Sequence, residues 1–258
     1  MTAHLLLQNA LLVATVMTLL WGWSVFRRDA SVVDPWWSIG FLLVAIQTLL
    51  ASGPAPAKRL LAAMVALWAV RLWAHLLWRS RGKAEDPRYR AFRERFGPER
   101  YWWVSFFQVF LLQGTLLFVI SAPLQAALAN PVAGPIRWNH LAGLLLFAAG
   151  LGFEAVGDWQ LHRFRSNRAK RGKVLDTGLW LYTRHPNYFG EAVLWWGFWL
   201  FAADAPWGLA TVLAPALMTF LLLRVSGVTM LEAHLKKSRP GYRDYVKRTS
   251  AFLPRQPR

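Results

Sequence analysis

Long apolar runs separated by short polar segments dominate this sequence. Several runs approach the roughly 20 residues that an α-helix needs to cross the hydrocarbon core of a bilayer. The pattern therefore predicts an all-α, polytopic membrane protein that forms a single domain of seven transmembrane helices. The expected helices are 4–26, 35–51, 58–78, 102–128, 139–160, 188–203 and 206–231, followed by a tail at 232–258.

The polar segments between these runs support the same division. Pro and Gly mark tight connections, and Pro35 suits the first turn of a helix. The charged loop after the third run contains 88–96, which we expect to form an interfacial helix with its aromatic side chains towards lipid. Because the first 20 residues lack the basic start and the cleavage site of a signal peptide, they are expected to remain as the first helix.

The distribution of basic residues predicts the orientation of the helices. Two lie in the first loop, eight in the third, seven in the fifth and eight in the tail, so 25 of the 30 lie on one side. The opposite loops hold three. This asymmetry predicts an N-terminus outside and a cytoplasmic C-terminus. Tryptophans cluster near the ends of the runs, as in an interfacial aromatic belt.

Composition excludes several classes of function. Only 17% of the residues are charged and 55% are hydrophobic, whereas soluble domains average about 25% charged. The net charge of +17 lies in loops rather than on a soluble domain, so no nucleic-acid partner is expected. The absence of cysteine excludes disulfides and thiol catalysis. The six histidines show no zinc-site spacing, and no metal is predicted.

Ionisable residues inside the apolar runs are candidates for function, because lipid penalises them strongly. Glu154 and Asp158 share one helix face, and Arg224 precedes Glu232 and Lys236 along another. A purely structural ion-pair network is the alternative for these groups. Asp34 opens the second expected helix, where an N-cap is its structural alternative.

The stretch 176–191 brings many hydrogen-bonding side chains to the entrance of one apolar run. It holds Tyr182, Arg184, His185, Asn187, Tyr188 and Glu191. A pocket there would gather these groups with Arg165, Lys173 and Arg224, which suits a cytosolic cofactor that carries phosphates. The alternative is that the arginines only set the topology. Neither a Gly-x-Gly-x-x-Gly nor a Walker motif is present.

The segment Gly-Leu-Trp-x-Tyr-x-Arg-His-Pro-Asn-Tyr-Phe-Gly-Glu at 178–191 resembles the signature of the steroid 5-alpha-reductase superfamily. More closely, it resembles a bacterial branch long labelled a domain of unknown function. The Asp-Pro-Trp-Trp at 34–37, the Glu-Asp-Pro-Arg-Tyr at 85–89 and the tail at 223–254 are similar to that branch as well. The resemblance therefore extends over nearly the whole chain.

This resemblance implies seven helices and an NADPH-dependent reductase that transfers a hydride to the C=C of an enone, such as a 3-oxo-delta-4 steroid. Asp34 matches the acid that contacts the substrate carbonyl, and Trp68 is the nearest match by spacing to that family's helix-three tyrosine. Glu154 stands where the steroid enzymes have an asparagine. Cofactor-binding positions are matched by Asp158, Arg165, Tyr182, Asn187, Glu191 and Arg224.

Two other classes of function remain open. Isoprenylcysteine and phospholipid methyltransferases share an Arg-His-Pro-x-Tyr motif and would use S-adenosylmethionine. A non-catalytic lipid-binding membrane protein would bind neither cofactor. The expected partners are membrane lipid and a small lipophilic substrate that enters from the bilayer. A monomer in the bacterial inner membrane is expected, and the sequence does not identify the natural substrate.

Overall fold

The computed structural model describes residues 2–132, 134–225, 228, 232, 235 and 238–257. Within these ranges the regular structure is helical, and the extended backbone makes one isolated bridge, which pairs Thr183 with Ser250. The chain divides into two compact units. Unit 1 comprises Met1–Ile136 and Ala202–Thr211, and unit 2 comprises Arg137–Phe201 and Val212–Arg258.

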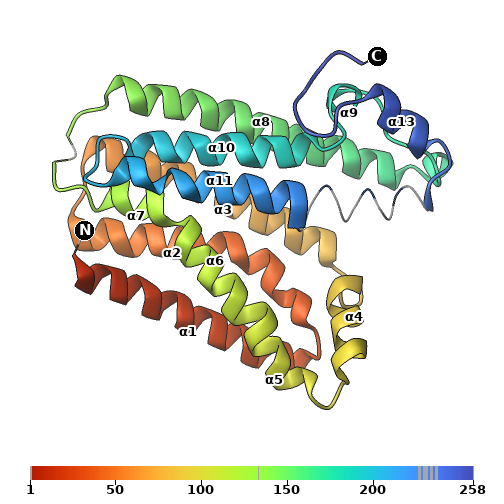
Figure 1. Ribbon diagram of the computed structural model, residues 1–258, viewed down its shortest axis with the longest axis horizontal. Coiled ribbons are helices and arrows are strands. Elements are labelled where there is room, and N and C mark those ends of the chain that lie inside the picture. The colour runs from red at the N-terminus through yellow and green to blue at the C-terminus, as the bar shows by residue number, and fades with distance from the viewer. Residues whose placement is uncertain are drawn as a thin grey trace. The chain divides into compact units, whose positions relative to one another are not determined.

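Unit 1 contains the first four apolar runs (Figure 1). Its helices pack mainly as α1 on α2 and α2 on α3. The predicted helix is present as the short α4, which begins at a proline and is capped by the Asp86 side chain. The expectation that its aromatic side chains all face lipid was wrong for Tyr89, which is buried and donates to Asp34. The bounds are α1 (Ala3–Arg27), η1 (Ala30–Val32), α2 (Val33–Ser52), α3 (Pro56–Ser80) and α4 (Pro87–Phe96).

The fourth predicted helix, 102–128, is broken into consecutive segments. They are α5 (Tyr101–Ser105), the π-helical η2 (Phe106–Leu111), α6 (Leu112–Ile120) and α7 (Ala122–Leu128). Pro123 has no N–H and its ring excludes the carbonyl one turn earlier, so a straight helix cannot pass through it. The stretch 102–128 is therefore helical with a break at Ser121, two residues before Pro123.

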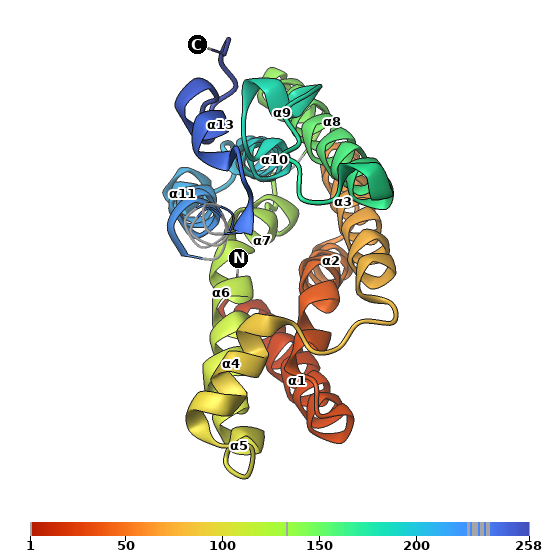
Figure 2. The ribbon, with the colours of Figure 1, turned by 90° about the vertical axis from the view of Figure 1, so that its right-hand side faces the viewer.

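A buried polar network joins three helices of unit 1. The Asn9 amide on α1 donates to Thr48 Oγ1 on α2 and to Gln125 Oε1 on α7, both at 2.9 Å. Gln125 in turn donates to Ser121 Oγ at 2.8 Å. Such hydrogen bonds hold transmembrane helices together, because lipid offers these polar groups no partners. The network fixes α7 against α1 and α2, which Figure 2 shows in end view.

Unit 2 is organised around the long helix α8. The predicted helix 139–160 extends further, to Ser166, so that α8 carries Arg163 and Arg165 on its last two turns. Up to Val225, the stretch predicted as helix 206–231 consists of a 3-10 turn, an α-helix and a π-helical turn. The bounds are α8 (Trp138–Ser166), η3 (Arg168–Lys170), α9 (Leu179–Tyr182), α10 (Pro186–Ala202), η4 (Gly208–Val212), α11 (Leu213–Phe220), η5 (Leu221–Val225) and α13 (Tyr242–Arg248).

Glycines let α8 and α10 approach each other backbone to backbone. A Cβ at Gly150 would lie 2.6 Å from the Gly190 oxygen, and one at Gly143 would lie 2.7 Å from the Gly197 oxygen. Gly157 lies against the start of α10, where an added Cβ would be 3.1 Å from the backbone nitrogen of Asn187. Successive contacts are two turns apart on α8, and on α10, which runs antiparallel, they step from Gly197 to Gly190 and then to the start of the helix. The glycines therefore set the register of α8 against α10.

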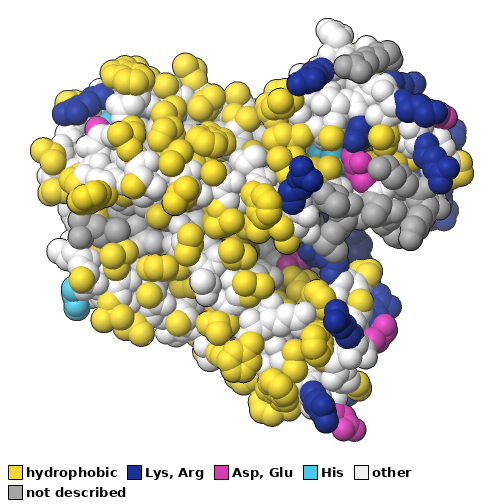
Figure 3. All heavy atoms as spheres, in the orientation of Figure 1, with side chains coloured by type: hydrophobic (Ala, Val, Ile, Leu, Met, Phe, Trp, Pro, Cys, Tyr) yellow, Lys and Arg dark blue, Asp and Glu magenta, His cyan; other side chains and the backbone are white. Residues whose placement is uncertain are grey.

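Six helices are long and apolar enough to cross a membrane by length and composition. Apolar side chains cover much of the surface of the helices, while Lys and Arg side chains lie around α9 and α13 in unit 2 and around α4 in unit 1 (Figure 3). α10 is shorter, at 17 residues. The chain is thus a multi-pass helical membrane protein, and the seventh span and the orientation stay predictions. The six are Ala3–Arg27, Ala30–Ser52, Pro56–Ser80, Tyr101–Ile120, Trp138–Ser166 and Gly208–Val225.

The glycine contacts give a test with a matched control. We expect Gly150→Ala to lower the free energy of unfolding by about 1–3 kcal/mol, because the new methyl group forces α8 away from α10. Gly152 lies on the same helix with open space around its Cβ position. Gly152→Ala should leave the stability unchanged or raise it, since alanine is the better helix former. Thermal unfolding of both variants in detergent measures the difference; equal midpoints would contradict the proposed contact.

Candidate functional site

The register of α8 and α10 brings together an acid and an amide. Asn187 Nδ2, in the first turn of α10, donates to Asp158 Oδ1 on α8 at 3.1 Å. Asp158 is buried and Asn187 is half-buried. Gly157 directly precedes Asp158 and permits this close approach of the two helices. The sequence had marked both residues as candidates, and the structure joins them.

Two further carboxylates lie close by on the same helices. Glu154 is one turn before Asp158 on α8, and Glu191 is one turn after Asn187 on α10; both are buried. Trp195 Nε1 donates to Glu191 Oε1 at 3.0 Å, which fixes the rotamer of that carboxylate. We call Glu154, Asp158, Asn187 and Glu191 the carboxylate–amide cluster. Its members are rich in hydrogen-bond acceptors and are held at defined positions.

A second cluster forms around Glu232. The Arg184 Nε atom donates to Glu232 Oε1 at 2.7 Å, and His185 Nε2 lies 3.2 Å from the same oxygen. All three side chains are buried. The imidazole of His185 also stacks on the Tyr188 ring with 5.5 Å between centroids and 3° between planes. A buried carboxylate shared by these two donors is typical of a structural ion pair.

The ion pair alters the acidity of Glu232. Burial alone would raise the pKa of this carboxyl, but the hydrogen bonds from His185 and Arg184 outweigh it and lower the pKa to about 2. A lowered pKa means that the ionised form stabilises the fold. This contribution is complete above the ordinary glutamate pKa of 4.5 and is lost as the pH falls towards 2.

Arg184 also holds the C-terminal segment of the chain. Its Nη1 atom donates to the carbonyl oxygens of Val246, at 3.1 Å, and Thr249. Its backbone N–H donates to the Ser250 carbonyl at 2.9 Å, and buried Thr183 donates from Oγ1 to the Phe252 carbonyl at 2.8 Å. The Arg-His half of the motif therefore binds the protein's own tail.

The other predicted cofactor residues lie outside these contacts. Four of them have exposed side chains: Arg165, Lys173, Tyr182 and Arg224. The last three of these belong to neither cluster. Arg224 lies on the π-helical turn η5. Lys236 falls outside the described residues. The structure thus places the described candidates in a carboxylate–amide cluster, in an ion-pair cluster and at exposed positions, and the single pocket expected from the sequence stays a prediction.

Asp34 in unit 1 forms its own hydrogen-bonded group. Tyr89 Oη donates to Asp34 Oδ1 at 2.5 Å, and Arg88 Nη2 donates to Asp34 Oδ2 at 2.8 Å. Gln113 Nε2 donates to Tyr89 Oη at 3.1 Å. Burial and the neighbouring Asp34 raise the pKa of the Tyr89 hydroxyl, which therefore stays protonated. In this pair the Tyr89 hydroxyl is the proton donor and the Asp34 carboxyl is the acceptor.

The structure changes one interpretation of unit 1 and leaves another untested. The N-cap alternative for Asp34 was wrong, because α2 begins earlier, at Val33, and the Asp34 carboxylate bonds to α4 instead. Trp68 is fully buried in α3 and packs on the Phe41 ring with centroids 5.8 Å apart. Core packing accounts for its position. The catalytic assignment of Trp68 stays a prediction.

The sequence contains one signal of the site that the predictions above did not use. Glycines recur every seven residues at Gly143, Gly150 and Gly157, and again at Gly190 and Gly197. Such spacing of small residues marks close helix contacts in membrane proteins. By contrast, the pairing of Tyr89 with Asp34 joins residues 55 positions apart and has no local signature.

The carboxylate–amide cluster suits a ligand rich in hydroxyl and amide groups. Carboxylates accept hydrogen bonds from ribose hydroxyls and carboxamide N–H groups, and the Asn187 amide can both donate and accept. The exposed Arg165 and Lys173 offer charge for phosphates, with arginine favouring bidentate contacts. These residues could therefore hold a ligand that carries hydroxyl, amide and phosphate groups.

These features define a class of protein: a multi-pass helical membrane protein with buried polar clusters near the ends of its helices. The chain belongs to the family described as protein of unknown function DUF1295, whose family model matches residues 20–249. It is similar to the uncharacterized protein C594.04c of Schizosaccharomyces pombe (strain 972 / ATCC 24843), with 27% identity over 270 residues that cover 92% of this chain and 76% of that protein. No solved structure matches it.

The ion pair predicts a large effect of one substitution. We expect Glu232→Gln to lower the free energy of unfolding by about 3–5 kcal/mol, because the variant leaves the buried Arg184 charge without its carboxylate. Hydrogen exchange should rise over 242–252, the segment that Arg184 holds. Asp244→Asn is the control, because Asp244 is exposed and pairs with nearby Lys247 at the surface. The idea fails if both variants exchange alike.

Proposed function

We propose that this protein is an NADPH-dependent membrane reductase that acts on the C=C bond of an enone, most favourably the delta-4 bond of a 3-oxo-delta-4 steroid. The observation that supports it best is the hydrogen bond of Asn187 to Asp158 within a group of buried carboxylates. Buried acids at such density are costly unless a ligand or a partner uses them. The resemblance of 178–191 to the reductase signature supports the same function.

Each part of the cofactor has residues suited to it. Glu191, oriented by Trp195, would accept from the carboxamide N–H of the nicotinamide, and Asn187 would bond to the same group. Asp158 would accept from a ribose hydroxyl. Arg165, Lys173 and Arg224 are exposed cations that would bind the phosphates. When bound, NADPH would supply a hydride for the β carbon of the enone.

Unit 1 supplies the acid in this proposal. Negative charge develops on the enone carbonyl as the double bond is reduced, and a placed hydrogen-bond donor lowers the barrier. Tyr89 Oη donates to Asp34 Oδ1, and Arg88 Nη2 donates to Asp34 Oδ2 at 2.8 Å, so this carboxyl holds the Tyr89 hydroxyl in place. Tyr89 would donate to the substrate carbonyl, and Asp34 would orient that hydroxyl.

Cofactor binding is the first test. Purified protein in detergent should quench its tryptophan fluorescence on titration with NADPH, and Asn187→Ala or Glu191→Gln should weaken binding about ten- to a hundredfold, since each removes a hydrogen bond to a buried group. Glu94→Gln on exposed α4 is the control and should bind as the unaltered protein does. S-adenosylmethionine should not compete.

The outcome separates the three classes of function. Binding of S-adenosylmethionine with no response to NADPH would establish the methyltransferase class instead. Binding of neither cofactor by folded protein would overturn both enzymatic readings. Thermal unfolding midpoints of the variants confirm that any loss of binding is not a loss of folding.

The acid has a separate test. Tyr89→Phe and Asp34→Asn should lower turnover of an enone substrate at least about a hundredfold, the usual contribution of general acid catalysis. Both should keep NADPH affinity, because neither altered group is among the residues proposed to bind the cofactor. Tyr242→Phe in α13 is the control; burial raises the Tyr242 pKa to about 12, so this hydroxyl also stays neutral. Unchanged turnover of Asp34→Asn and Asp34→Leu would remove Asp34 from the mechanism.

A further inference from the structure

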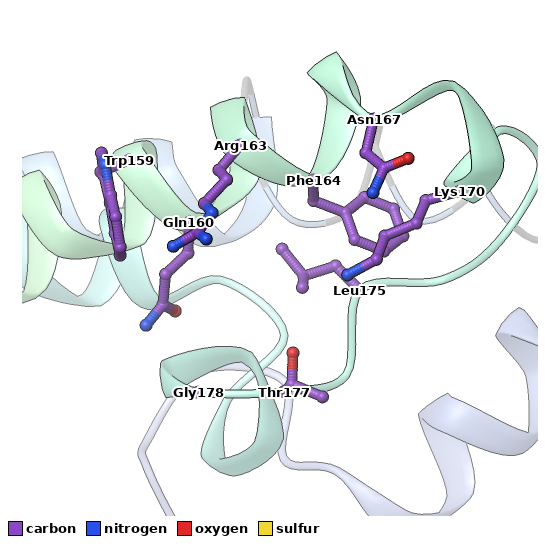
Figure 4. Close-up of a pocket in the computed structure, with 9 residues that line it drawn as sticks. All are labelled: Trp159, Gln160, Arg163, Phe164, Asn167, Lys170, Leu175, Thr177 and Gly178. Carbon is purple, nitrogen blue, oxygen red and sulfur yellow. The ribbon is translucent and has the colours of Figure 1, made fainter.

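A hollow of about 300 Å³ lies at the C-terminal end of α8. Its walls come from the last turns of α8, from η3 and from the loop that leads to α9, all within unit 2. Figure 4 shows Trp159, Arg163 and Phe164 on α8, and Lys170, Leu175 and Thr177 on the segment that follows. Among the described residues that line this hollow, two are cationic and none is acidic.

The two cations are each held over an aromatic ring. The Arg163 guanidinium lies 5.5 Å from the centroid of Trp159, and the Lys170 ammonium lies 5.3 Å from that of Phe164. Both basic side chains are exposed and extend into the hollow (Figure 4). Cation–π contacts restrict the side chains without neutralising their charge. Two positioned positive charges therefore remain available to an anion.

An exposed apolar stripe of α8 leads to this hollow. Leu145, Gly152, Val156 and Trp159 recur at helical spacing and are exposed. Nothing lies within 4 Å of the Cβ position of Gly152, so the stripe is open there. On a helix that can cross a bilayer, such a face meets acyl chains, and Trp159 stands where an interfacial tryptophan belongs.

The hollow is separate from the carboxylate–amide cluster. Asp158 is buried against α10, whereas its neighbour Trp159 is more than half exposed, at 56%. Trp159 and Arg163, four residues apart, share one face of α8, and this face differs from the one that Asp158 presents to α10. The assignment of the hollow therefore does not depend on the proposed reductase function.

We propose that this hollow binds the phosphate of an anionic phospholipid whose acyl chains lie along the exposed stripe of α8. Arg163 and Lys170 would contact the phosphate, and Thr177 and Asn167 would offer hydrogen bonds to the polar headgroup. The shared chemistry is a phosphate group, which a free phosphate also carries. The apolar stripe and Trp159 favour the lipid as its source.

The test compares lipids on the intact protein. Protein in dodecyl maltoside micelles is titrated with dioleoyl phosphatidylglycerol or with dioleoyl phosphatidylcholine, and retained lipid is counted by native mass spectrometry. Phosphatidylglycerol should be retained preferentially. The double variant Arg163→Ala/Lys170→Ala should weaken its binding about tenfold or more, given what two basic residues contribute near an anionic surface.

A neighbouring pair provides the matched control. Arg168→Ala/Arg171→Ala removes the same charge from the same loop, at exposed residues that do not line the hollow. It should retain phosphatidylglycerol within about twofold of the unaltered protein, a difference well below the tenfold that 1.4 kcal/mol represents. Trp159→Ala should weaken lipid binding but not the binding of inorganic phosphate. Unfolding midpoints without added lipid check that all variants fold.

Several outcomes would overturn the proposal. Equal losses in the two double variants would mean that net charge, not the hollow, attracts the lipid. Equal retention of phosphatidylcholine would remove the requirement for an anionic group. Full competition by millimolar inorganic phosphate or by NADPH, with no effect of Trp159→Ala, would identify a site for free phosphate instead.

Discussion

The close contact of α8 with α10 through glycine is the constraint on which unit 2 depends. In lipid the hydrophobic effect does not drive helices together, so packing must supply the stability of their contact. Gly143 meets Gly197, Gly150 meets Gly190 and Gly157 meets the start of α10, at points about 10 Å apart along α8. With no side chain between the backbones, the two helices have one register. Sliding by a single residue would drive side chains into the facing backbone.

This register decides which polar groups share a space. It sets Asp158 against the Asn187 amide and leaves Glu154 beside the glycine backbone of α10. It also anchors α9, whose Trp180 Nε1 donates to the Gly157 carbonyl at 3.2 Å. Because the scaffold already places these groups, a ligand would meet an arrangement that needs little reorganisation. Preorganised polar groups of this kind give binding its specificity.

Much of this organisation could be predicted from the sequence, because membrane helices can be recognised by their length and apolarity. The amphipathic α4 and the polar candidates on α8 and α10 were predicted for the same reason. The break at Pro123, the π-helical turns and the bond of Tyr89 to Asp34 were not. These features depend on tertiary contacts, because the residues of a helix do not indicate which distant loop will pack against it. Arg184 was assigned to a ligand because its buried partner, Glu232, lies 48 residues away.

Pro186 divides the segment Arg-His-Pro-Asn-Tyr-Phe-Gly-Glu at 184–191 into two halves that contact different parts of the protein. Helix α10 begins at this proline, which suits a first helical position. Thr183, before it, has extended backbone angles, so Arg184 and His185 point to the C-terminal segment and Glu232. Asn187 and Glu191, after it, lie on the helix and face the polar groups of α8 and Trp195. In this chain the Arg-His half of the motif therefore holds the C-terminal segment, and the half after the proline faces the polar groups of α8.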